Sequence, residues 1–473
     1  MSQDVIFNTR YFKSISGANM KTSLLRSSQA NRVRSIVLLI NSALLFSLVA
    51  NRAQSQSPKI DRDRGKEMLK TVKEDIQQYY YDRSFHGMDV DARFNTARDK
   101  IKTATSNSQI FGIIAQAVVD LNDSHTFFVP PDRYASFDYG WRMQMIGDTP
   151  YIVGVKPGSE AEAKGLKAGD VVYSIDGYAP TRENLWKIEY SYYLLKPRAV
   201  VHLVLENPDG SLRELELKTK VLEPDFRALF GQRKAMPLKE IQYYEEGQKL
   251  IVCKIPTFVL QEKDIDEMMK KIKGHNAAIL DLRRNSGGYE TALKRLIGYL
   301  FDHDIKIGDL VQRSGHKALV AKTVGEKVFK GQLVILVDSK SASASELFAH
   351  VLQLERRATI IGDKTAGAVM RAKHYGHAYE RGPEAMMWFS SYGVSITEAD
   401  IVMSDGKGLE HIGVTPDELL LPKGSDLAAS RDPVLSRAAA ILGVKIDPKK
   451  AGALYRTDRT TEIVLEEEPN EQP

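Results

Sequence analysis

Apolar side chains recur at the spacing of an α-helix in two segments near the beginning of the sequence, 61–81 and 108–121. Ser108 stands at the start of the second segment, where an N-cap residue is expected. Both segments therefore predict amphipathic helices. We expect them to form a small helical region that ends at the sequence Asp-Ser-His-Thr, residues 123–126, just beyond a helix C-terminus.

After this helical region the pattern changes to short strands separated by turns. An apolar strand is predicted at 151–155, and a second one at 171–175 ends at an Asp-Gly pair that is typical of a tight turn. A helix at 183–195 and an alternating strand at 200–205 complete the unit. The pattern indicates a small domain made mainly of β-strands.

Strands and helices alternate from residue 250 onward. The predicted strands are 250–255, 277–282, 333–337 and 359–361, and the predicted helices are 264–272, 292–301 and 346–356. Strands that are apolar along nearly their whole length, with amphipathic helices between them, are typical of parallel β-α units. The sequence therefore predicts an α/β domain in its second half.

Composition excludes several classes of protein. The chain has 473 residues, of which 43% are hydrophobic and 27% are charged, and these values exclude disorder throughout. At roughly 100–200 residues per domain, the length allows two to four domains. The net charge of +5 is small for this length and implies no nucleic-acid partner. The single cysteine, Cys253, excludes an internal disulfide and a cysteine-based zinc cluster.

One apolar run, residues 36–50, lies between a polar segment that carries Arg32 and Arg34 and the predicted helical region. It would form about 23 Å of helix, which is less than the ~30 Å hydrocarbon core of a bilayer. A positive flank, a short apolar run and small residues after it are typical of a secretory signal peptide, and an uncleaved signal anchor is the alternative. We expect an exported protein, periplasmic or secreted, with residues 36–50 as its membrane anchor if they are retained.

Two strand-to-helix junctions carry more small and polar residues than a turn needs. Residues 281–288 (DLRRNSGG) end in two glycines, whose backbone turns sharply and aims N–H groups at a ligand. Residues 339–346 (SKSASASE) place three serines, alternating with alanine, before a helix that needs one N-cap. A hydroxyl at such a helix N-terminus lies where a developing negative charge is favoured. Glu346 and His350 have the i,i+4 spacing of metal ligands, but without a third ligand they predict a packed or solvated pair.

Five motifs together resemble the C-terminal processing, or tail-specific, serine peptidases. In chain order they are LNDSHT, DLRRNSGG, VDSKSASASELFAHVLQ, IIGDKTAG and GLEHIGVTPD. The resemblance covers residues 61–441 and implies an α/β fold with a crotonase/ClpP-like spiral core of β-β-α units, a helical N-terminal region and an inserted PDZ domain. It also implies a serine peptidase that needs no metal, no other cofactor and no ATP.

The run KPGSEAEAKGLKAGDVVYSIDG, residues 156–177, resembles a PDZ domain in the circularly rearranged form that bacterial peptidases carry. Such a domain captures an extended peptide by strand addition and holds a terminal carboxylate with backbone amides. The resemblance implies that Tyr139, Gly140 and Trp141 form this carboxylate-binding loop. A small β-domain without a ligand is the alternative.

The family uses two catalytic arrangements, which share a nucleophile at the middle serine of Ser-Ala-Ser-Ala-Ser, here Ser343. In one branch a lysine base follows 25 positions later; that position holds Ala368, and Lys364 and Lys373 are out of register. The other branch resembles the tricorn core peptidase, in which the histidine of a Ser-His pair is the base. There a second serine and a glutamate near a Gly-Val-x-Pro-Asp motif orient the histidine.

This second arrangement implies that Ser343 is the nucleophile, His125 the general base, and Ser124 and Glu410 the residues that orient the base. A serine at its ordinary pKa is a poor nucleophile and needs such an oriented base. Glu398 lies close enough in sequence to compete with Glu410. The implied oxyanion hole consists of backbone N–H groups of Gly287 or Gly288 and of Ala344.

The sequence therefore predicts an exported serine endopeptidase whose substrates are unfolded or C-terminal polypeptide segments, and an oligomer is compatible with it. Its predicted parts are a signal peptide or anchor (1–55), a helical region (56–135), a PDZ domain (136–222), a peptidase core (223–425), a C-terminal helical segment (426–456) and a disordered acidic tail (457–473). Two alternatives remain: a Ser-Lys peptidase of the same family, and a non-catalytic module that binds peptides or hydrophobic ligands.

Overall fold

The computed structural model describes residues 58–131, 136–207, 209–222, 240–379 and 390–455. The predicted signal segment and the predicted acidic tail therefore lie outside the described residues. The chain divides into two compact units, 1–61 and 62–473, and of the first unit only the beginning of one helix is described. All contacts that follow lie within the second unit. No described helix is long and apolar enough to cross a bilayer.

Three α-helices and a short 3-10 turn make up the helical region. They are α2 (Pro58–Tyr79), η1 (Phe85–Gly87), α3 (Val90–Ile101) and α4 (Asn107–Val119). The predicted N-cap of α4 was wrong by two residues: the side chain of Ser106, not Ser108, accepts a hydrogen bond from the N–H of Gln109. The apolar faces pack into one core around Ile76 and Ile114. Helix α4 ends shortly before the segment that carries His125.

A small β-domain follows, built on a five-stranded antiparallel sheet of order β3-β4-β5-β6-β7. Its elements are β2 (Ser136–Asp138), β3 (Trp141–Ile146), β4 (Thr149–Val155), α5 (Glu160–Ala163), β5 (Val171–Ile175), α6 (Leu185–Tyr190), the π-helix η2 (Ser191–Leu195), β6 (Val200–Glu206), β7 (Leu212–Lys218) and β8 (Lys220–Leu222). Strands β2 and β8 pair with each other at the two ends of this domain. The single helix predicted at 183–195 is therefore an α-helix that continues as a π-helical turn.

A six-stranded sheet of order β18-β15-β14-β11-β10-β9 forms the centre of the following part, and only β9 runs antiparallel to its neighbour. Its strands are β9 (Gln242–Glu246), β10 (Leu250–Lys254), β11 (Ala277–Asp281), β14 (Gln332–Val337), β15 (Thr359–Gly362) and β18 (Glu418–Leu419). The predicted parallel β-α units are confirmed by this sheet.

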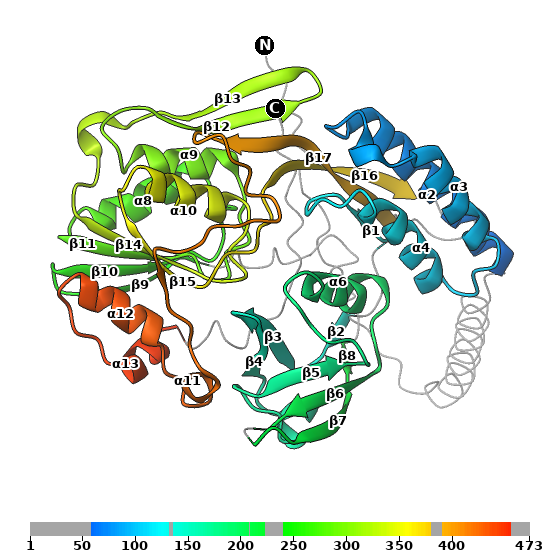
Figure 1. Cartoon of the computed structure of the whole chain (residues 1–473), viewed down its shortest axis with the longest axis horizontal. Helices are drawn as coiled ribbons and strands as arrows, with labels where there is room; N and C mark the ends of the chain where they lie inside the picture. Colours follow the sequence, from blue (N-terminus) through cyan, green and yellow to red (C-terminus); the bar gives the residue numbers. More distant parts are fainter. Residues whose placement is uncertain (1–57, 132–135, 208, 223–239, 380–389, 456–473) are drawn as a thin grey trace, which may run out of the picture. The chain divides into compact units, whose positions relative to one another are not determined.

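Helices cover both faces of the six-stranded sheet, because its side chains alternate between two apolar cores. Ile251 and Cys253 pack beneath α8 (Glu262–Ile272), α9 (Glu290–Gly298) and α10 (Ala344–Leu354). Leu250 and Val252 face α12 (Pro433–Ile441) and α13 (Pro448–Ala453). Figure 1 shows the two groups of helices on opposite sides of the sheet.

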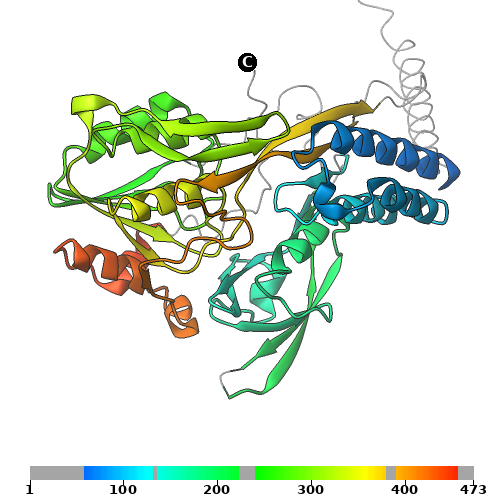
Figure 2. The same cartoon turned by 45° about the horizontal axis from the view of Figure 1, so that its top comes forward.

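A second, antiparallel sheet connects this part to the helical region. Its strands are β1 (Phe127–Val129), β12 (Ile305–Gln312), β13 (Gly315–Ala321), β16 (Met370–Tyr379) and β17 (Ser390–Met403), and the turns η3 (Gly325–Lys327) and α11 (Gly424–Ala428) lie outside it. Strand β17 pairs with β1, β12 and β16. Its residues Tyr392, Val394 and Ile396 pack into the helical core, and Figure 2 shows the hairpin β16–β17 reaching the helices. This sheet attaches the segment that carries His125 to the part that carries Ser343.

Candidate active site

Ser343 occupies a strained position at the start of helix α10. Strand β14 ends at Val337, and the following loop leads to Ser343 as the N-cap residue, with φ 54° and ψ −119°. A positive φ is costly for any residue other than glycine and persists where the surroundings enforce it. Gly287 permits the close packing of this residue: a Cβ atom at Gly287 would lie 2.7 Å from the Cβ of Ser343. Ser343 is half-buried.

The buried carboxylate of Glu346 holds the loop around Ser343 in place. It accepts hydrogen bonds from the N–H groups of Ser343 (3.1 Å), Gly367 (2.7 Å) and Ala368 (2.9 Å) and from the hydroxyl of Thr365 (2.5 Å). Burial raises the pKa of Glu346 to about 7, although the hydrogen bonds act in the opposite direction. Glu346 was expected to form a packed or solvated pair with His350, and its role as a fourfold acceptor in the loop of Ser343 was missed.

Ser124, His125 and Glu410 form a chain of hydrogen bonds. The hydroxyl of Ser124 lies 2.9 Å from Oε2 of Glu410 and 2.7 Å from Nδ1 of His125. The backbone N–H of Ser124 donates to Oε1 of the same carboxylate at 2.7 Å. Because a carboxylate only accepts, the hydroxyl proton of Ser124 points to Glu410, and the Ser124 oxygen accepts from Nδ1–H of His125. This network assigns the free lone pair of the imidazole to Nε2, as a general base requires.

Asp123 fixes the backbone that carries the imidazole. Its Oδ1 accepts hydrogen bonds from the N–H groups of His125 (2.9 Å) and Thr126 (2.7 Å) and from the hydroxyl of Thr397 (2.8 Å). Burial lowers the pKa of His125, while the negative charges of Glu410 and Asp123 raise it. The net lowering keeps the imidazole neutral, and therefore basic, at neutral pH.

The peptide group between Ala368 and Val369 connects the backbone of Ser343 to the carboxylate of Glu410. The N–H of Ser343 donates to the carbonyl of Ala368 at 2.8 Å, and the N–H of Val369 donates to Oε2 of Glu410 at 2.7 Å. Among the described residues no hydrogen bond joins Oγ of Ser343 to the imidazole of His125. Catalytic hydrogen bonds are often long without substrate and tighten when it binds.

Two backbone N–H groups near Ser343 stand free of hydrogen bonds within the described part of the chain, those of Gly288 and Ala344. The N–H of Gly287 donates instead to the side chain of Asn285 at 2.9 Å. Of the two glycines that the sequence offered for an oxyanion hole, Gly288 is therefore the one with an available donor. Asn285 is fully buried, and its side chain also donates to the carbonyl of Ile255, so it shapes this glycine turn.

The other acids and bases near the motifs are engaged elsewhere or exposed. Glu398 accepts a hydrogen bond from the hydroxyl of Tyr375 and takes no part in the contacts of Ser124. Lys364 and Lys373 are both exposed. Nε2 of His350 lies 3.4 Å from Asp405, whereas the carboxylate of Glu346 accepts from the backbone N–H of Ser343.

The predicted carboxylate-binding loop of the β-domain is partly occupied by its own contacts. Tyr139 is buried, and its hydroxyl donates to the carbonyl of Tyr192. The N–H of Gly140 donates to Asp138 at 2.9 Å. Trp141 begins β3, which is an edge strand of its sheet.

The β-domain contacts the loop that precedes Ser343. The amide of Gln144 donates to Asp338 at 2.7 Å, and the hydroxyl of Ser339 donates to the carbonyl of Met145. Lys340 forms an ion pair with Glu189 on α6 at 2.5 Å. The edge strand β3 therefore ends against the nucleophile loop.

Comparisons with known proteins agree with the motifs. Residues 249–420 match the model of peptidase family S41. The chain is 27% identical over 310 residues to the tail-specific protease of Haemophilus influenzae, covering 61% of this chain and 43% of that protein. It is 24% identical over 382 residues to the chloroplastic carboxyl-terminal-processing peptidase 2 of Arabidopsis thaliana, covering 73% of this chain and 67% of that protein. The chain thus spans less than half the length of the Haemophilus relative.

Solved structures agree on the fold. The mature form of CPAF in complex with lactacystin superimposes with a TM-score of 0.57 at 14% sequence identity, covering 85% of this chain and 98% of that one. Such low identity supports the mixed α/β fold and not the chemistry. Fold, motifs and family match agree: residues 249–420 match peptidase family S41, and the chain is similar to C-terminal processing peptidases, as its motifs predicted.

Proposed function

We propose that this protein is a serine endopeptidase in which Ser343 is the nucleophile and His125 the general base. The observation that carries the proposal is the chain of hydrogen bonds from Glu410 through Ser124 to His125, tied to the backbone of Ser343 by the Ala368–Val369 peptide. An alcohol at a strained helix N-terminus, with an oriented and neutral imidazole from another segment, has the parts that nucleophilic catalysis requires.

The reaction would proceed in two acyl-transfer steps. Oγ of Ser343 attacks the scissile carbonyl while Nε2 of His125 accepts its proton, and Ser124 and Glu410 stabilise the imidazolium that forms. The N–H groups of Gly288 and Ala344 would bind the oxyanion. The imidazolium then gives its proton to the leaving amine, the peptide bond breaks, and water hydrolyses the Ser343 ester by the same route in reverse.

An extended polypeptide is the substrate that this arrangement favours. Strand β3 is a sheet edge and reaches the nucleophile loop at Ser339. A peptide that adds to such an edge pairs through its backbone and must be unfolded over that stretch. We propose that the β-domain acts as a PDZ module that delivers unfolded or C-terminal segments to Ser343. We also propose export, on the basis of the apolar run 36–50.

The alternative functions have less support. A Ser-Lys mechanism needs a buried lysine that is held neutral, whereas Lys364 and Lys373 are exposed and Ala368 stands at the lysine position. A non-catalytic binding module would have no need of an imidazole oriented by Ser124 and Glu410.

Covalent labelling with a fluorophosphonate probe, together with hydrolysis of an unstructured peptide, tests the proposal. We expect labelling at Ser343, no labelling or hydrolysis in Ser343→Ala, and a loss of roughly 10²–10⁴-fold in His125→Ala, which is the range of general-base assistance. Ser314→Ala and His316→Ala, at an exposed turn, serve as matched controls and should keep full activity. Undiminished hydrolysis by purified Ser343→Ala would rule the proposal out.

A further inference from the structure

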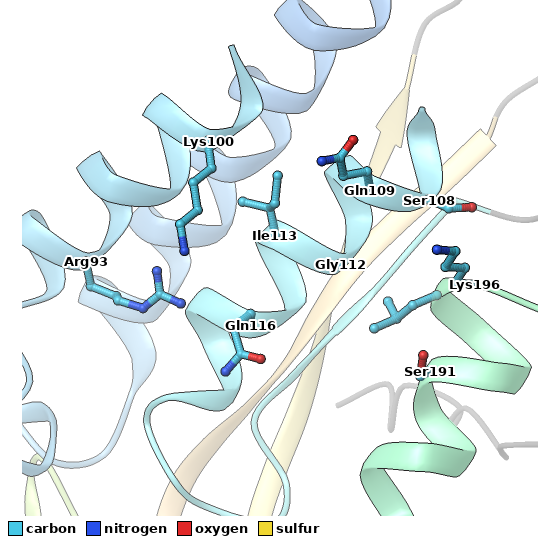
Figure 3. Close-up of a pocket in the computed structure, with 10 residues that line it drawn as sticks. Arg93, Lys100, Ser108, Gln109, Gly112, Ile113, Gln116, Ser191 and Lys196 are labelled. Atoms are coloured by element: carbon cyan, nitrogen blue, oxygen red, sulfur yellow. The ribbon is translucent and has the colours of Figure 1, made fainter. Parts of the chain in front are cut away.

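A groove on the surface of helix α4 is not used by the proposed catalytic mechanism. It has a volume of about 330 Å³ and lies between α3 on one side and the π-helix η2 on the other (Figure 3). Helix α4 supplies its floor through Ser108, Gln109, Gly112, Ile113 and Gln116.

The side walls of the groove carry only positive charge. Arg93 and Lys100 come from α3, Lys196 follows η2, and none of the lining residues is acidic. Arg93 is paired with Asp120, which also accepts a hydrogen bond from Gln116. Within the described part of the chain, the amines of Lys100 and Lys196 have no ion-pair or hydrogen-bond partner. The groove therefore presents two uncompensated cations, which attract an anionic ligand.

Gly112 leaves the floor of the groove open. It lies in the interior of α4, where glycine lowers helix stability relative to alanine. A Cβ atom at this position would have no atom within 4 Å, so packing does not require a glycine there. Any larger residue would project into the groove. Packing within the fold therefore does not explain this glycine.

The floor suits a polypeptide better than a small inorganic anion. Ser108, Gly112 and Gln116 are spaced four residues apart, so they form a stripe about 12 Å long on one side of the helix. Ile113 and Leu195 add apolar surface beside it. Amide and hydroxyl groups along such a stripe match the backbone of an extended chain, while the apolar residues match its aliphatic side chains.

We propose that this groove binds an acidic stretch of an extended polypeptide, with Lys100 and Lys196 facing its carboxylates and Gly112 giving room to its backbone. The binding step goes beyond the proposed hydrolysis, because it requires neither Ser343 nor His125. The groove also joins two elements next to the base. Helix α4 ends six residues before His125, and η2 follows Tyr190, whose hydroxyl donates to the carbonyl of Phe128.

Fluorescence anisotropy on the full chain carrying Ser343→Ala tests the proposal without interference from cleavage. The probe is a short fluorescein-labelled peptide of Glu, Leu and Gly with both ends blocked, so that a terminal carboxylate plays no part. We expect saturable binding that weakens as salt shortens the Debye length, and no binding of the same peptide with Gln in place of Glu.

Two variants locate the binding in the groove. Lys100→Glu combined with Lys196→Glu should weaken binding about tenfold, because two exposed ion pairs are replaced by repulsion. Gly112→Leu should abolish binding without any change of charge, and its helix should be at least as stable as the original one. The matched control Lys263→Glu with Lys317→Glu makes the same charge change at exposed positions far from the groove in sequence and should bind normally.

Three results would overturn the proposal: unchanged affinity in Gly112→Leu, equal loss in the Lys263/Lys317 control, or displacement of the peptide by inorganic phosphate at equal charge concentration. The last result would indicate a site for small anions only. Circular dichroism melting of each variant separates loss of binding from loss of fold. Because the assay measures binding alone, failure here leaves the peptidase proposal untouched, and an inactive wild-type enzyme would leave the groove proposal untouched.

Discussion

Ser343 and Glu410 hold opposite sides of one peptide group, the one between Ala368 and Val369. The carbonyl of Ala368 accepts from the N–H of Ser343 at 2.8 Å, and the N–H of Val369 donates to Glu410 at 2.7 Å. Position 368 is where a Ser-Lys relative would carry its base. In this chain Ala368 occupies that position and contributes only its backbone carbonyl. A base for Ser343 therefore has to come from another segment.

Glu410→Gln should reduce kcat by roughly 10²–10⁴-fold, because the base then loses the carboxylate that orients it through Ser124. An amide nitrogen cannot accept the hydrogen bonds that Glu410 receives from Ser124 and Val369. Steady-state hydrolysis of an unstructured peptide measures the effect, and KM should change little. Glu326→Gln, at an exposed turn, is the matched control. A fully active Glu410→Gln enzyme would show that Glu410 does not orient the catalytic base.

In the pH profile of kcat/KM, the midpoint of the acid limb should lie below the ordinary pKa of histidine, about 6.5. Burial lowers the pKa of His125, so the imidazole stays neutral and basic to lower pH. Asp123→Asn keeps the oxygen that binds the backbone N–H of His125 but removes a negative charge that favours the imidazolium. The limb should therefore move to still lower pH in this variant. A limb that moves upward would contradict the assignment of His125.

Glu346→Gln should impair both stability and activity. The carboxylate accepts four hydrogen bonds at a fully buried site, and an amide nitrogen leaves buried donors such as the N–H of Ser343 unpaired. Each buried donor left unpaired costs about 1–3 kcal/mol. Thermal melting should show a lower Tm, and kcat should fall because the loop of Ser343 loosens. A wild-type Tm would mean that this carboxylate is dispensable.

Gly287→Ala should abolish activity, since the new Cβ would lie 2.7 Å from the Cβ of Ser343. Gly315 offers a matched control: its φ of 118° resembles the 106° of Gly287, but a Cβ there would have no atom within 4 Å. Gly315→Ala therefore carries the same backbone strain, of order 1–3 kcal/mol, without the contact. Comparison of kcat in the two variants isolates the contact with Ser343. Equal activity in both would show that the close approach is unimportant.

Lys364→Ala and Lys373→Ala should each retain nearly full activity, because both side chains are exposed. The ammonium group of Lys373 lies over the ring of Tyr375, 5.7 Å from its centre. Peptide hydrolysis by the two variants measures this directly. If either variant were inactive while His125→Ala was harmless, the Ser-Lys mechanism would replace the one proposed here.

The sequence predicted the regular elements better than the irregular ones. Parallel strands such as β10 and β14 are apolar throughout, and their runs are visible without a structure. Helix α3 was missed although Val90, Phe94 and Ala97 share one face, because polar residues dominate the segment. The long hairpin β16–β17 was also missed, since its residues serve two different cores and do not alternate regularly. The spiral arrangement of the core and the PDZ identity of the β-domain remain predictions.

The contacts of the candidate site could not be derived from spacing. Ser124 and Glu410 lie far apart in the chain, and only the family resemblance suggested that they meet. Glu346 stands three residues after Ser343, at the capping-box position of a helix start, but it was interpreted as one partner of a packed or solvated pair with His350. Asn285, two residues before Gly287, accepts a hydrogen bond from the N–H of that glycine, and this role was also missed.

The order in which the chain is synthesised has a consequence for the protein itself. Ser124 and His125 emerge from the ribosome first, Ser343 follows, and Glu410 comes last of the four. Since the carboxylate of Glu410 anchors both the backbone and the hydroxyl of Ser124, the base is unoriented until that late segment has folded onto the rest. A nascent chain therefore carries no oriented base until the segment with Glu410 has folded.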